Sequence, residues 1–588
     1  MATEMDFDDI LELVGNADWF QRRLIYLLVY PVSFLLAWMV LNILFMVSVP
    51  NHWCHVPGRE LYNLTVDEWK NLTIPRLEND AGEEHFSQCS MFNMSIGNGF
   101  ALTPVLDANG TAATVGCLHG WEYDKSSWRR TAATDFDWVC GDSANPTTVL
   151  TINSVGSVVG TLVYGILADL IGRKPIFFLN IAIFLIGGII NIFAPTFLVF
   201  VTSRAIAQTT FPSLYNTFFT LAVELVGPSL RGHVNAVAFF VWTVSMCSLP
   251  LVAWLVADWQ VLGLITIVPA VGFFFIWRYI PESPRWLISV RRKAEAKKIL
   301  QEIAAVNKKE VPKDLDAMLE HLSAQIENEK KYGIFSLFTY RLSAIRTVFL
   351  TFCFIGNIVI YYALQMNVSN MAGNEFLNFF LLSAVEAPAN VFGWLGSEHL
   401  GRRWTEVCSF AVTGVACLTI MPLLFYPNLT WLVTTLAITA KFAITVSFFV
   451  VFLQSAEIYP TVLRGSGQAL GSTMAYAVGI GSPAIIYLST ANRILPYLIL
   501  GMIAVVCAIM ASFLPETLGT DMPQCVEDTR DFLKDQPYFS FITRRSLKRR
   551  EACTAGSGAR RRSTMVVSQD GLNGVTTRLA KPDAECHG

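Results

Sequence analysis

Three ionisable side chains lie deep within long apolar stretches of this sequence: Arg204, Glu386 and Lys441. A charged group in the hydrocarbon interior of a membrane costs about 2.5 to 3.5 kcal/mol on insertion scales, so each is a candidate for a functional role. The carboxylate of Glu386 could attract a cationic substrate. It could equally form an ion pair with Lys441 or Arg204, and the sequence leaves both interpretations open.

Polar and aromatic residues near these charges complete the predicted substrate site. Amide side chains could orient polar groups or make ordinary hydrogen bonds between helices. Aromatic faces can hold a cation, although most aromatics in such segments pack against lipid or other helices. The predicted substrate-binding residues are Glu386, Lys441, Arg204, Asn357, Trp242, Tyr361, Tyr362 and Tyr476, with Asn42, Gln365, Trp38, Phe211, Tyr215, Phe239 and Phe240 as further candidates.

The composition indicates that these residues sit in a membrane. Of the 588 residues, 53% are hydrophobic and only 15% are charged, whereas soluble proteins carry about 25% charged residues. Twelve apolar segments each approach the roughly 20 residues that a bilayer core requires. They are 24–46, 147–167, 175–193, 197–225, 233–257, 261–280, 345–365, 376–395, 404–426, 431–454, 465–488 and 494–514. We therefore predict an all-α polytopic membrane protein with twelve transmembrane helices in two six-helix bundles.

The polar loop between the first two segments carries extracellular signals. It contains four cysteines, Cys54, Cys89, Cys117 and Cys140, which predict two disulfides in an oxidising compartment with three pairings open. It also contains four N-glycosylation sequons, at Asn63, Asn71, Asn93 and Asn109. Further sequons at Asn367 and Asn428 lie so near the bilayer that we do not expect them to be glycosylated.

Positive charge gives the orientation. Arg22 and Arg23 precede the first segment, so we predict a cytoplasmic N-terminus and a retained first span. The predicted domains are a cytoplasmic N-terminus (1–23), the first helix (24–46), an extracellular loop (47–146), the rest of the first bundle (147–281), a cytoplasmic linker (282–344), the second bundle (345–514) and a cytoplasmic tail (515–588). The basic tail could attract anionic lipid or direct a kinase to Ser563, or it could simply be disordered. We predict a multi-pass plasma-membrane protein.

Three charged motifs occur once in each predicted bundle. The turn at 165–174 recurs at 393–403, the Glu224 to Arg231 motif recurs from Glu457 to Arg464, and Pro281-Glu282 recurs as Pro515-Glu516. Three repeats in one order indicate duplicated six-helix units. Their acids and bases could form a cytoplasmic gate whose ion pairs join the two bundles only while that side is closed, or they could be topological anchors in the headgroups. The predicted gate residues are Asp169, Gly172, Arg173, Glu224, Arg231, Glu398, Arg402, Glu457 and Arg464.

These motifs resemble the signature set of the major facilitator superfamily. The cysteine-rich first loop, Asp258-Trp259, Tyr361-Tyr362 and the 456–461 stretch AEIYPT are similar, more narrowly, to its organic cation, anion and zwitterion (carnitine) transporter family. The resemblance covers roughly residues 7–519. It implies alternating access, with substrate bound near the midplane between the two bundles.

The same resemblance bears on the substrate. Tyr476 stands where anion carriers typically have Arg and cation carriers Asp, and Asn390 stands where anion carriers often have Lys. We therefore expect a small organic zwitterion, such as a carnitine-like or amino-acid-like compound, or an organic cation. The alternatives are an organic anion transporter or exchanger, or a surface glycoprotein receptor that does not transport.

Other function classes find no support in the sequence. It contains no phosphate-binding Gly-x-x-x-x-Gly-Lys-Ser/Thr loop of an ATP-driven pump and no constellation of an enzyme, and we predict no cofactor, no metal site and no nucleic-acid partner. The expected partners are the small organic substrate and membrane lipid, and whether a coupling ion takes part is open.

Overall fold

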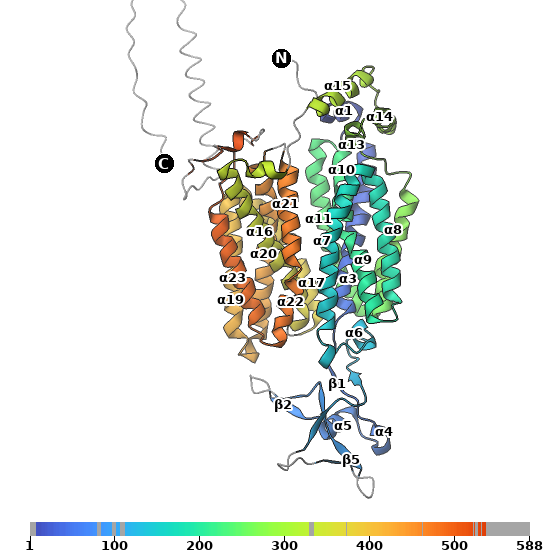
Figure 1. Cartoon of the computed structure of the whole chain (residues 1–588), viewed down its shortest axis with the longest axis vertical. Coiled ribbons are helices and arrows are strands. Elements are labelled where there is room, and N and C mark those ends of the chain that lie inside the picture. The colour runs from blue at the N-terminus through green and yellow to red at the C-terminus, as the bar shows by residue number, and fades with distance from the viewer. Residues whose placement is uncertain are drawn as a thin grey trace, which may run out of the picture.

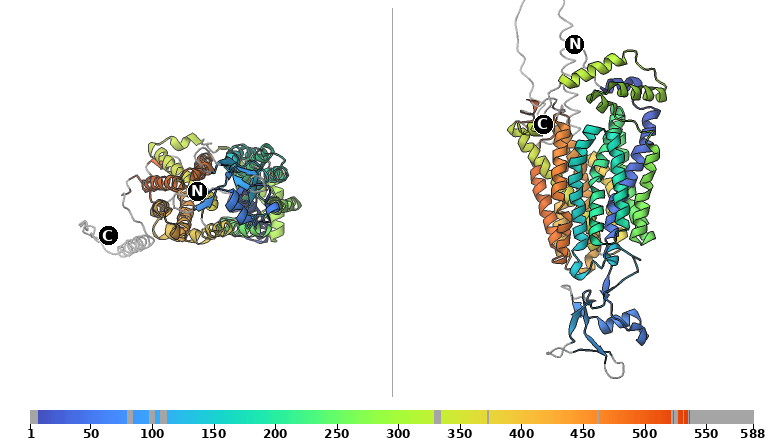
Figure 2. Two further views of the ribbon diagram at one scale, coloured as in Figure 1. Left: turned by 90° about the horizontal axis from the view of Figure 1, so that it is seen from below. Right: turned by 45° about the vertical axis from the view of Figure 1, so that its right-hand side comes forward.

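The structure is a computed structural model of the chain. It describes residues 7–78, 84–96, 102–105, 112–328, 334–371, 373–460, 463–520, 523, 527–530, 532–534 and 536. Two helical bundles stand side by side, one from each half of the chain (Figure 1). The segment with the short strands, which follows the first long helix, projects from one end of the bundles. The helices that connect the two halves lie at the other end, over the first half (Figure 2). We call these the loop end and the linker end.

Long apolar helices make up both halves. The first half contains α1 (Phe7–Val14), α2 (Trp19–Leu24), η1 (Ile25–Val29), α3 (Tyr30–Met46), α7 (Asn145–Ile171), α8 (Arg173–Ile192), α9 (Phe197–Thr209), α10 (Phe211–Glu224), α11 (Pro228–Val256), α12 (Trp259–Ile267) and η3 (Val268–Ile276). The second half contains η4 (Ile334–Phe338), α16 (Arg341–Met366), η5 (Asn367–Asn370), α17 (Glu375–Ala384), α18 (Glu386–His399), α19 (Arg402–Leu423), η6 (Pro427–Leu429), α20 (Thr430–Ile458), α21 (Arg464–Gly479), α22 (Ser482–Tyr487), η7 (Leu488–Thr490), α23 (Leu495–Ser512) and η8 (Glu527–Arg530).

Among the described residues, eleven helical stretches are long and apolar enough to cross a membrane. The predicted fourth span is not among them, and it is divided at Thr210 into α9 and α10. Pro212 lies in the first turn of α10 and has no N–H to continue the hydrogen bonds of α9. The two pieces together still cover the predicted segment.

The segment at the loop end folds around short strands. Four two-stranded antiparallel sheets pair β1 (His52–Cys54) with β8 (Trp121–Tyr123), β2 (Arg76–Glu78) with β3 (Glu84–Phe86), β4 (Ser90–Phe92) with β7 (Thr114–Gly116), and β5 (Met94–Ile96) with β6 (Leu102–Pro104). Three short helices, α4 (Arg59–Tyr62), α5 (Val66–Thr73) and α6 (Ala132–Asp135), and the turn η2 (Cys140–Asp142) complete it. Disulfides join Cys54 to Cys117 and Cys89 to Cys140, which resolves the predicted pairing.

The sequons differ in their surroundings. Asn63 and Asn71 are exposed on this segment and Asn93 is half-buried, whereas Asn109 lies outside the described residues. Asn367 is buried and its Nδ2 donates to the Tyr497 hydroxyl at 2.8 Å, so this side chain is already engaged inside the second bundle.

The linker end carries three helices, α13 (Pro284–Ser289), α14 (Lys293–Asn307) and α15 (Leu315–Asn328). They pack on the start of the chain. The Asn307 side chain accepts from the backbone N–H of Phe20 at 2.9 Å and donates to Gln21 Oε1 at 3.2 Å. The linker is therefore fixed to the first half.

The two halves contact each other at the loop end. Glu375, the first residue of α17, accepts hydrogen bonds from Ser48 at 2.9 Å and from the indole N–H of Trp128. The Phe45 ring stacks on Phe376 with centroids 5.8 Å apart and touches Phe379. Deeper in the membrane, α7 packs against α21 and α22, and α11 packs against α17.

The turns predicted at 165–174 and 393–403 are much shorter than expected. Residues 165–171 belong to α7 and 393–399 to α18, and the chain reverses essentially at Gly172 and Gly401. Their φ angles of 119° and 88°, with ψ near 160°, lie in a region that only glycine occupies readily. A Cβ at Gly172 would collide with the Glu282 carboxylate and one at Gly401 with that of Glu516.

Candidate substrate cavity and charge clusters

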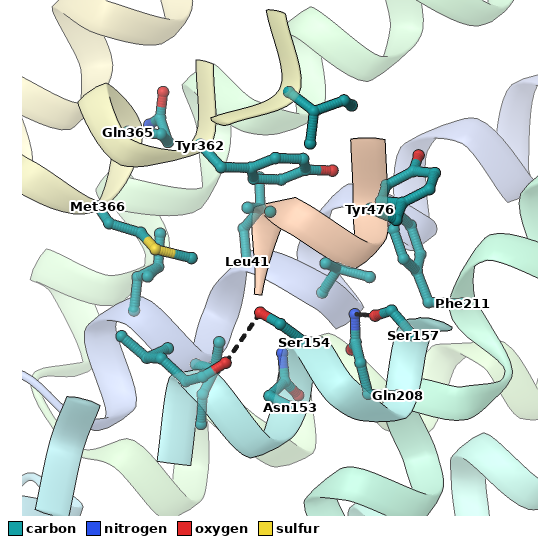
Figure 3. A pocket seen from close by; sticks show the side chains of 16 residues that line it. Leu41, Asn153, Ser154, Ser157, Gln208, Phe211, Tyr362, Gln365, Met366 and Tyr476 are labelled. Carbon is teal, nitrogen blue, oxygen red and sulfur yellow. Dashed lines mark hydrogen bonds between the residues drawn. The ribbon is translucent and has the colours of Figure 1, made fainter. Parts of the chain in front are cut away.

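A cavity lies between the two halves (Figure 3). Its volume is about 70 Å³, so in this conformation it is narrow. The first half contributes side chains from α3, α7, α9 and α10, and the second half contributes α16 and α21. Its walls are mostly apolar with a few polar groups, which is typical of small-molecule sites.

Several of those polar groups have no protein partner. Asn153 Oδ1, Gln208 Oε1 and both amide atoms of Gln365 are buried and unbonded within the described residues. A buried polar atom without a hydrogen bond costs about 1–3 kcal/mol, so a bound polar molecule would relieve that cost. The side chains of Tyr362 and Tyr476 line the same space (Figure 3).

Glu386, Lys441 and Tyr361 form one buried cluster in the second half. Lys441 Nζ lies 3.0 Å from Glu386 Oε1, and the two side chains are 0% and 5% exposed. The Tyr361 hydroxyl donates to the same oxygen at 2.6 Å, and Lys441 Nζ stands 3.1 Å from the centre of the Tyr361 ring. Tyr361 is the neighbour of Tyr362, whose ring it meets edge to face at 5.4 Å.

Helix geometry explains this position. Glu386 is the first residue of α18, at the break between α17 and α18. Pro388 follows two residues later and cannot donate to the carbonyl of Ala384, which ends the hydrogen bonding of α17. The break thus places a carboxylate at mid-membrane depth opposite Lys441 of α20.

Arg204 lies apart from this cluster, in α9 of the first half. It is 1% exposed, and its Nη2 donates to the carbonyls of Met39 and Val40 and to Asn42 Oδ1 at 3.0–3.2 Å. Its Nε and Nη1 have no hydrogen-bond partner among the described residues. Gln208, one turn further along α9, and Val40 both line the cavity, so this cation stands directly behind its wall.

The predicted substrate residues therefore divide into groups. Tyr362, Tyr476, Phe211 and Gln365 line the cavity, whereas Glu386, Lys441 and Tyr361 do not and are connected to it through the contact of the Tyr361 ring with Tyr362. Trp242 reaches the site through the Phe211 ring, at 6.4 Å. Asn357 is fully buried inside the second bundle, where its Nδ2 donates to the Cys353 carbonyl at 3.0 Å.

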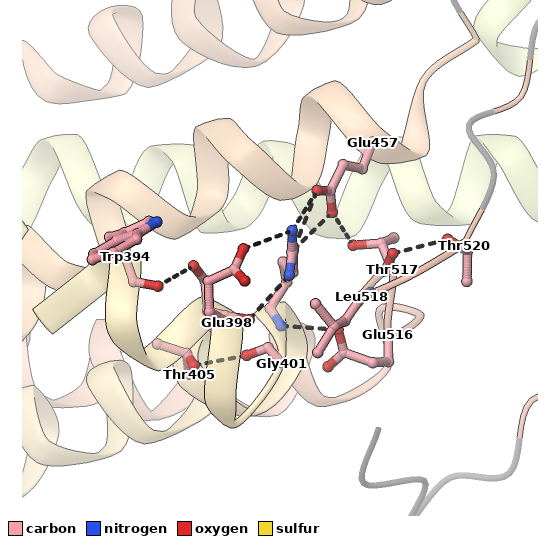
Figure 4. A network of polar contacts seen from close by, with 11 residues as sticks. Trp394, Glu398, Gly401, Thr405, Glu457, Glu516, Thr517, Leu518 and Thr520 are labelled. Carbon is pink, nitrogen blue, oxygen red and sulfur yellow. Dashed lines mark hydrogen bonds and ion pairs between the residues drawn. The ribbon is translucent and has the colours of Figure 1, made fainter. Parts of the chain in front are cut away.

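The charged motif of the second half forms a buried network at the linker end (Figure 4). Arg402 binds Glu457 through Nε and Nη2, with N–O distances of 2.9–3.2 Å. Thr517 donates to Glu457 Oε2 at 2.5 Å. Glu398 Oε1 lies 4.0 Å from Arg402, so its contribution is weaker. The network ties α18, α19 and α20 to the segment that follows α23.

The first half repeats this arrangement more loosely. Arg173 lies 3.1 Å from Asp169 and 3.8 Å from Glu224. Asp169 is 77% exposed, and exposed pairs contribute only about 0–1 kcal/mol. Arg231 does not pair with Glu224; it binds Asp8 of α1 at 2.6 Å. In this conformation these contacts, like those of Arg402, hold helices of one half together, and a gate between the halves in another conformation stays a prediction. Arg464, the remaining predicted gate residue, begins α21 beside Glu457.

Two acids of the repeated Pro-Glu motifs, Glu282 and Glu516, were not among the predicted gate residues, yet they bind the starts of α8 and α19. Glu282 accepts from the backbone N–H groups of Arg173 and Lys174 at 3.1–3.3 Å, and Glu516 does the same for Arg402 and Arg403 at 2.9–3.1 Å. Carboxylates favour helix N-termini. Burial raises the pKa of Glu282 and of Glu516, and these hydrogen bonds partly offset that rise.

Comparison with known proteins agrees with this architecture. A family model described as "Sugar (and other) transporter" matches residues 110–527. Organic cation transporter 1 of Caenorhabditis elegans is 31% identical over 553 residues, covering 93% of this chain and 92% of that protein. The chain belongs to the major facilitator superfamily. The Beta-alanine transporter of Drosophila melanogaster is 31% identical, covering 89% of each chain. Organic cation/carnitine transporter 2 of Homo sapiens is 30% identical, covering 89% of this chain and 93% of that protein.

Solved structures show the same fold. The xylose transporter XylE from E. coli, in an inward-open conformation, superposes with a TM-score of 0.52 over 66% of this chain and 90% of that chain. At 18% identity, this likeness concerns the fold alone. It confirms the predicted all-α polytopic architecture of the major facilitator superfamily, whose members are membrane transporters.

Proposed function

We propose that this protein is a secondary transporter of small organic zwitterions or cations. The observation that carries the proposal is the buried Glu386–Lys441 pair, with Tyr361 bonded to the same carboxylate and in ring contact with the cavity residue Tyr362. A substrate ammonium can compete for Glu386, and a substrate carboxylate can compete for Lys441. The printed names of the relatives, among them organic cation, β-alanine and carnitine transporters, support the same substrate class.

The proposed orientation places the loop end outside and the linker end in the cytoplasm of a plasma-membrane protein. Two disulfides and the exposed Asn63 and Asn71 support an extracellular loop end. Arg22 and Arg23 of α2 support a cytoplasmic linker end. Both termini would then be cytoplasmic. Substrate would cross without chemical change, so no enzymatic step is proposed.

Alternating access follows from the contacts between the halves. The contacts of Glu375 with Ser48 and Trp128 join the halves at the loop end and would have to break when that end opens. The charge networks at the linker end brace each half as a unit that can move as a rigid body. Arg402 with Glu457, and Arg173 with Glu224, would keep each bundle intact during this movement.

Uptake by the purified protein in proteoliposomes tests the proposal. We expect uptake of radiolabelled carnitine, β-alanine or tetraethylammonium that saturates, and little uptake of an aryl anion such as p-aminohippurate. Empty liposomes and the Glu386→Gln variant are the controls, and uptake of the cationic probes should fall in that variant. Uptake of the aryl anion alone would favour the second candidate, an organic anion exchanger, which the carboxylate-free surroundings of Arg204 support. No uptake of any probe would favour a receptor.

A further inference from the structure

Glu406 is a fully buried acid that the proposed substrate site does not use. It lies in the second turn of α19 and is 0% exposed. Ser447 of α20 donates a hydrogen bond to its Oε1 at 3.0 Å. Its Oε2 has no hydrogen-bond partner among the described residues.

No cation compensates this carboxyl group in the described part of the chain. The titratable groups that face it from neighbouring helices are two buried thiols, Cys353 of α16 and Cys507 of α23. From α20 it meets the Ser447 hydroxyl, while Lys441 of that helix is paired with Glu386.

The two bases on its own helix point elsewhere. Arg402 binds Glu457 and the Ser397 carbonyl. The Arg403 guanidinium lies over the Trp404 ring, 5.3 Å from its centre. An ionised carboxylate buried without a cation is strongly unfavourable, so these surroundings favour the neutral acid.

Asn357 provides the second, independent observation. Its side chain lies against the Glu406 carboxyl group, and Asn357 Oδ1 and Glu406 Oε2 are each buried without a hydrogen-bond partner among the described residues. The Asn357 amide cannot simply turn over, because its Nδ2 is engaged with the Cys353 carbonyl at 3.0 Å. A proton on Glu406 Oε2 would make this unpartnered oxygen a hydrogen-bond donor, which an ionised carboxylate cannot be.

This acid shares two helices with the substrate site. Asn357 stands one turn before Tyr361 on α16, on the same helical face. Ser447 stands six residues after Lys441 on α20. A change in the charge of Glu406 would therefore act on the helices that hold the Glu386–Lys441 pair.

We propose that Glu406 binds and releases a proton in each transport cycle, so that substrate movement is coupled to proton movement. The acid carries the proton in the conformation described above. It releases the proton to water when movement of the halves lets water reach it, and it takes one up again before the reverse movement. The inference rests on the proposed transport function and adds the coupling ion.

Two modes of transport in proteoliposomes separate coupling from transport itself. Counterflow, the exchange of labelled for unlabelled carnitine or β-alanine at equal pH, needs substrate binding and conformational change but no net proton movement. Accumulation under a pH gradient, imposed in either polarity, requires coupling. One pH unit corresponds to about 1.4 kcal/mol per proton and can drive up to about tenfold accumulation.

We expect the wild type to show counterflow and gradient-driven accumulation in one polarity. Glu406→Gln, which mimics the protonated acid, should keep counterflow and lose the gradient-driven part. The matched control is Glu302→Gln, which neutralises an exposed linker acid and should change neither. If Glu406→Gln still accumulates substrate under the gradient, or if the wild type exchanges substrate without responding to pH, Glu406 is not the proton site. The proposed transport function would be unaffected by that result.

Ser447→Ala gives a second test that keeps the acid. Loss of the hydroxyl donor disfavours the ionised carboxylate, so the midpoint of the pH profile of accumulation should move to higher pH. An unmoved midpoint contradicts the assignment even if Glu406→Gln fails to fold. Absence of wild-type counterflow for both probes and for tetraethylammonium would refute the transport function, and the inference with it.

Discussion

A double-mutant cycle on Glu386 and Lys441 distinguishes the two roles that the carboxylate could play. At the observed 3.0 Å, two unit charges attract by about 5 kcal/mol at an effective dielectric constant of 20. Desolvation offsets part of this attraction. Removing one partner nevertheless leaves the other charge buried and unpaired, and such breaks cost about 3–5 kcal/mol.

We therefore expect Glu386→Gln and Lys441→Met each to destabilise the protein by about 3–5 kcal/mol. The double variant should recover most of that loss, because no unpaired charge remains, and the coupling energy should exceed about 2 kcal/mol. Equilibrium unfolding in detergent measures the stability of all four proteins. Initial uptake rates of carnitine and tetraethylammonium in proteoliposomes measure function.

The two readouts separate structure from substrate contact. If Glu386 only neutralises Lys441, the double variant regains both stability and uptake. If Glu386 also holds the substrate cation, stability returns while uptake of the cationic probes stays low. Single variants as stable as the wild type would refute the reasoning, because the pair would then carry no coupling.

Four further predictions follow from the structure. Gly401→Ala should reduce surface expression and transport. A residue with a side chain is destabilised by about 1–3 kcal/mol at the Gly401 φ of 88°, and the new methyl group would collide with the Glu516 carboxylate. Normal expression and uptake would contradict this prediction. Glu457→Gln should impair transport more than Asp169→Asn, because Glu457 is buried against Arg402 whereas Asp169 is 77% exposed. Uptake rates measured at equal surface expression test this difference. Burial lowers the pKa of His52 below its ordinary 6.5, so the folded loop binds a proton less readily than the unfolded loop. The stability of the loop should therefore fall as the pH drops below about 6.5. Limited proteolysis of the loop should show this loss in the wild type and much less of it in His52→Gln. Asn63→Gln and Asn71→Gln should each reduce the loss of mass that glycosidase treatment produces in protein from eukaryotic cells. An unchanged loss of mass would argue against glycosylation at that residue.

Much of this architecture was predictable because hydrophobic length and charge position are local properties of a membrane sequence. The paired motifs around Gly172 and Gly401 revealed the duplication directly. The extent of the turns was not predictable, since apolar residues such as Ile166 and Leu170 fit a helix and a membrane-surface turn equally well. The division of the fourth span at Thr210 was signalled only by Pro212, and a proline inside a transmembrane helix often merely bends it.

The partners of the charges were harder to predict than their positions. Arg231 and Glu224 are seven residues apart in one motif, yet Arg231 binds Asp8 from the beginning of the chain. The duplicated Pro-Glu motifs were visible, but their function depends on backbone N–H groups of helices more than a hundred residues away. Contacts between distant segments are set by packing, which no local pattern records.

The asymmetry between the two ends gives these contacts a mechanical meaning. At the loop end, Glu375 and Phe376 bind residues of the opposite half, and these contacts would have to separate when that end opens. At the linker end, Arg402 is bound to Glu457, and Glu516 caps the start of its helix. If these acids joined the two halves directly, opening that end would expose buried charges at a cost of several kcal/mol. In the conformation described they are satisfied within one half, so movement of the bundles need not break them, and each network braces the helices of its own half.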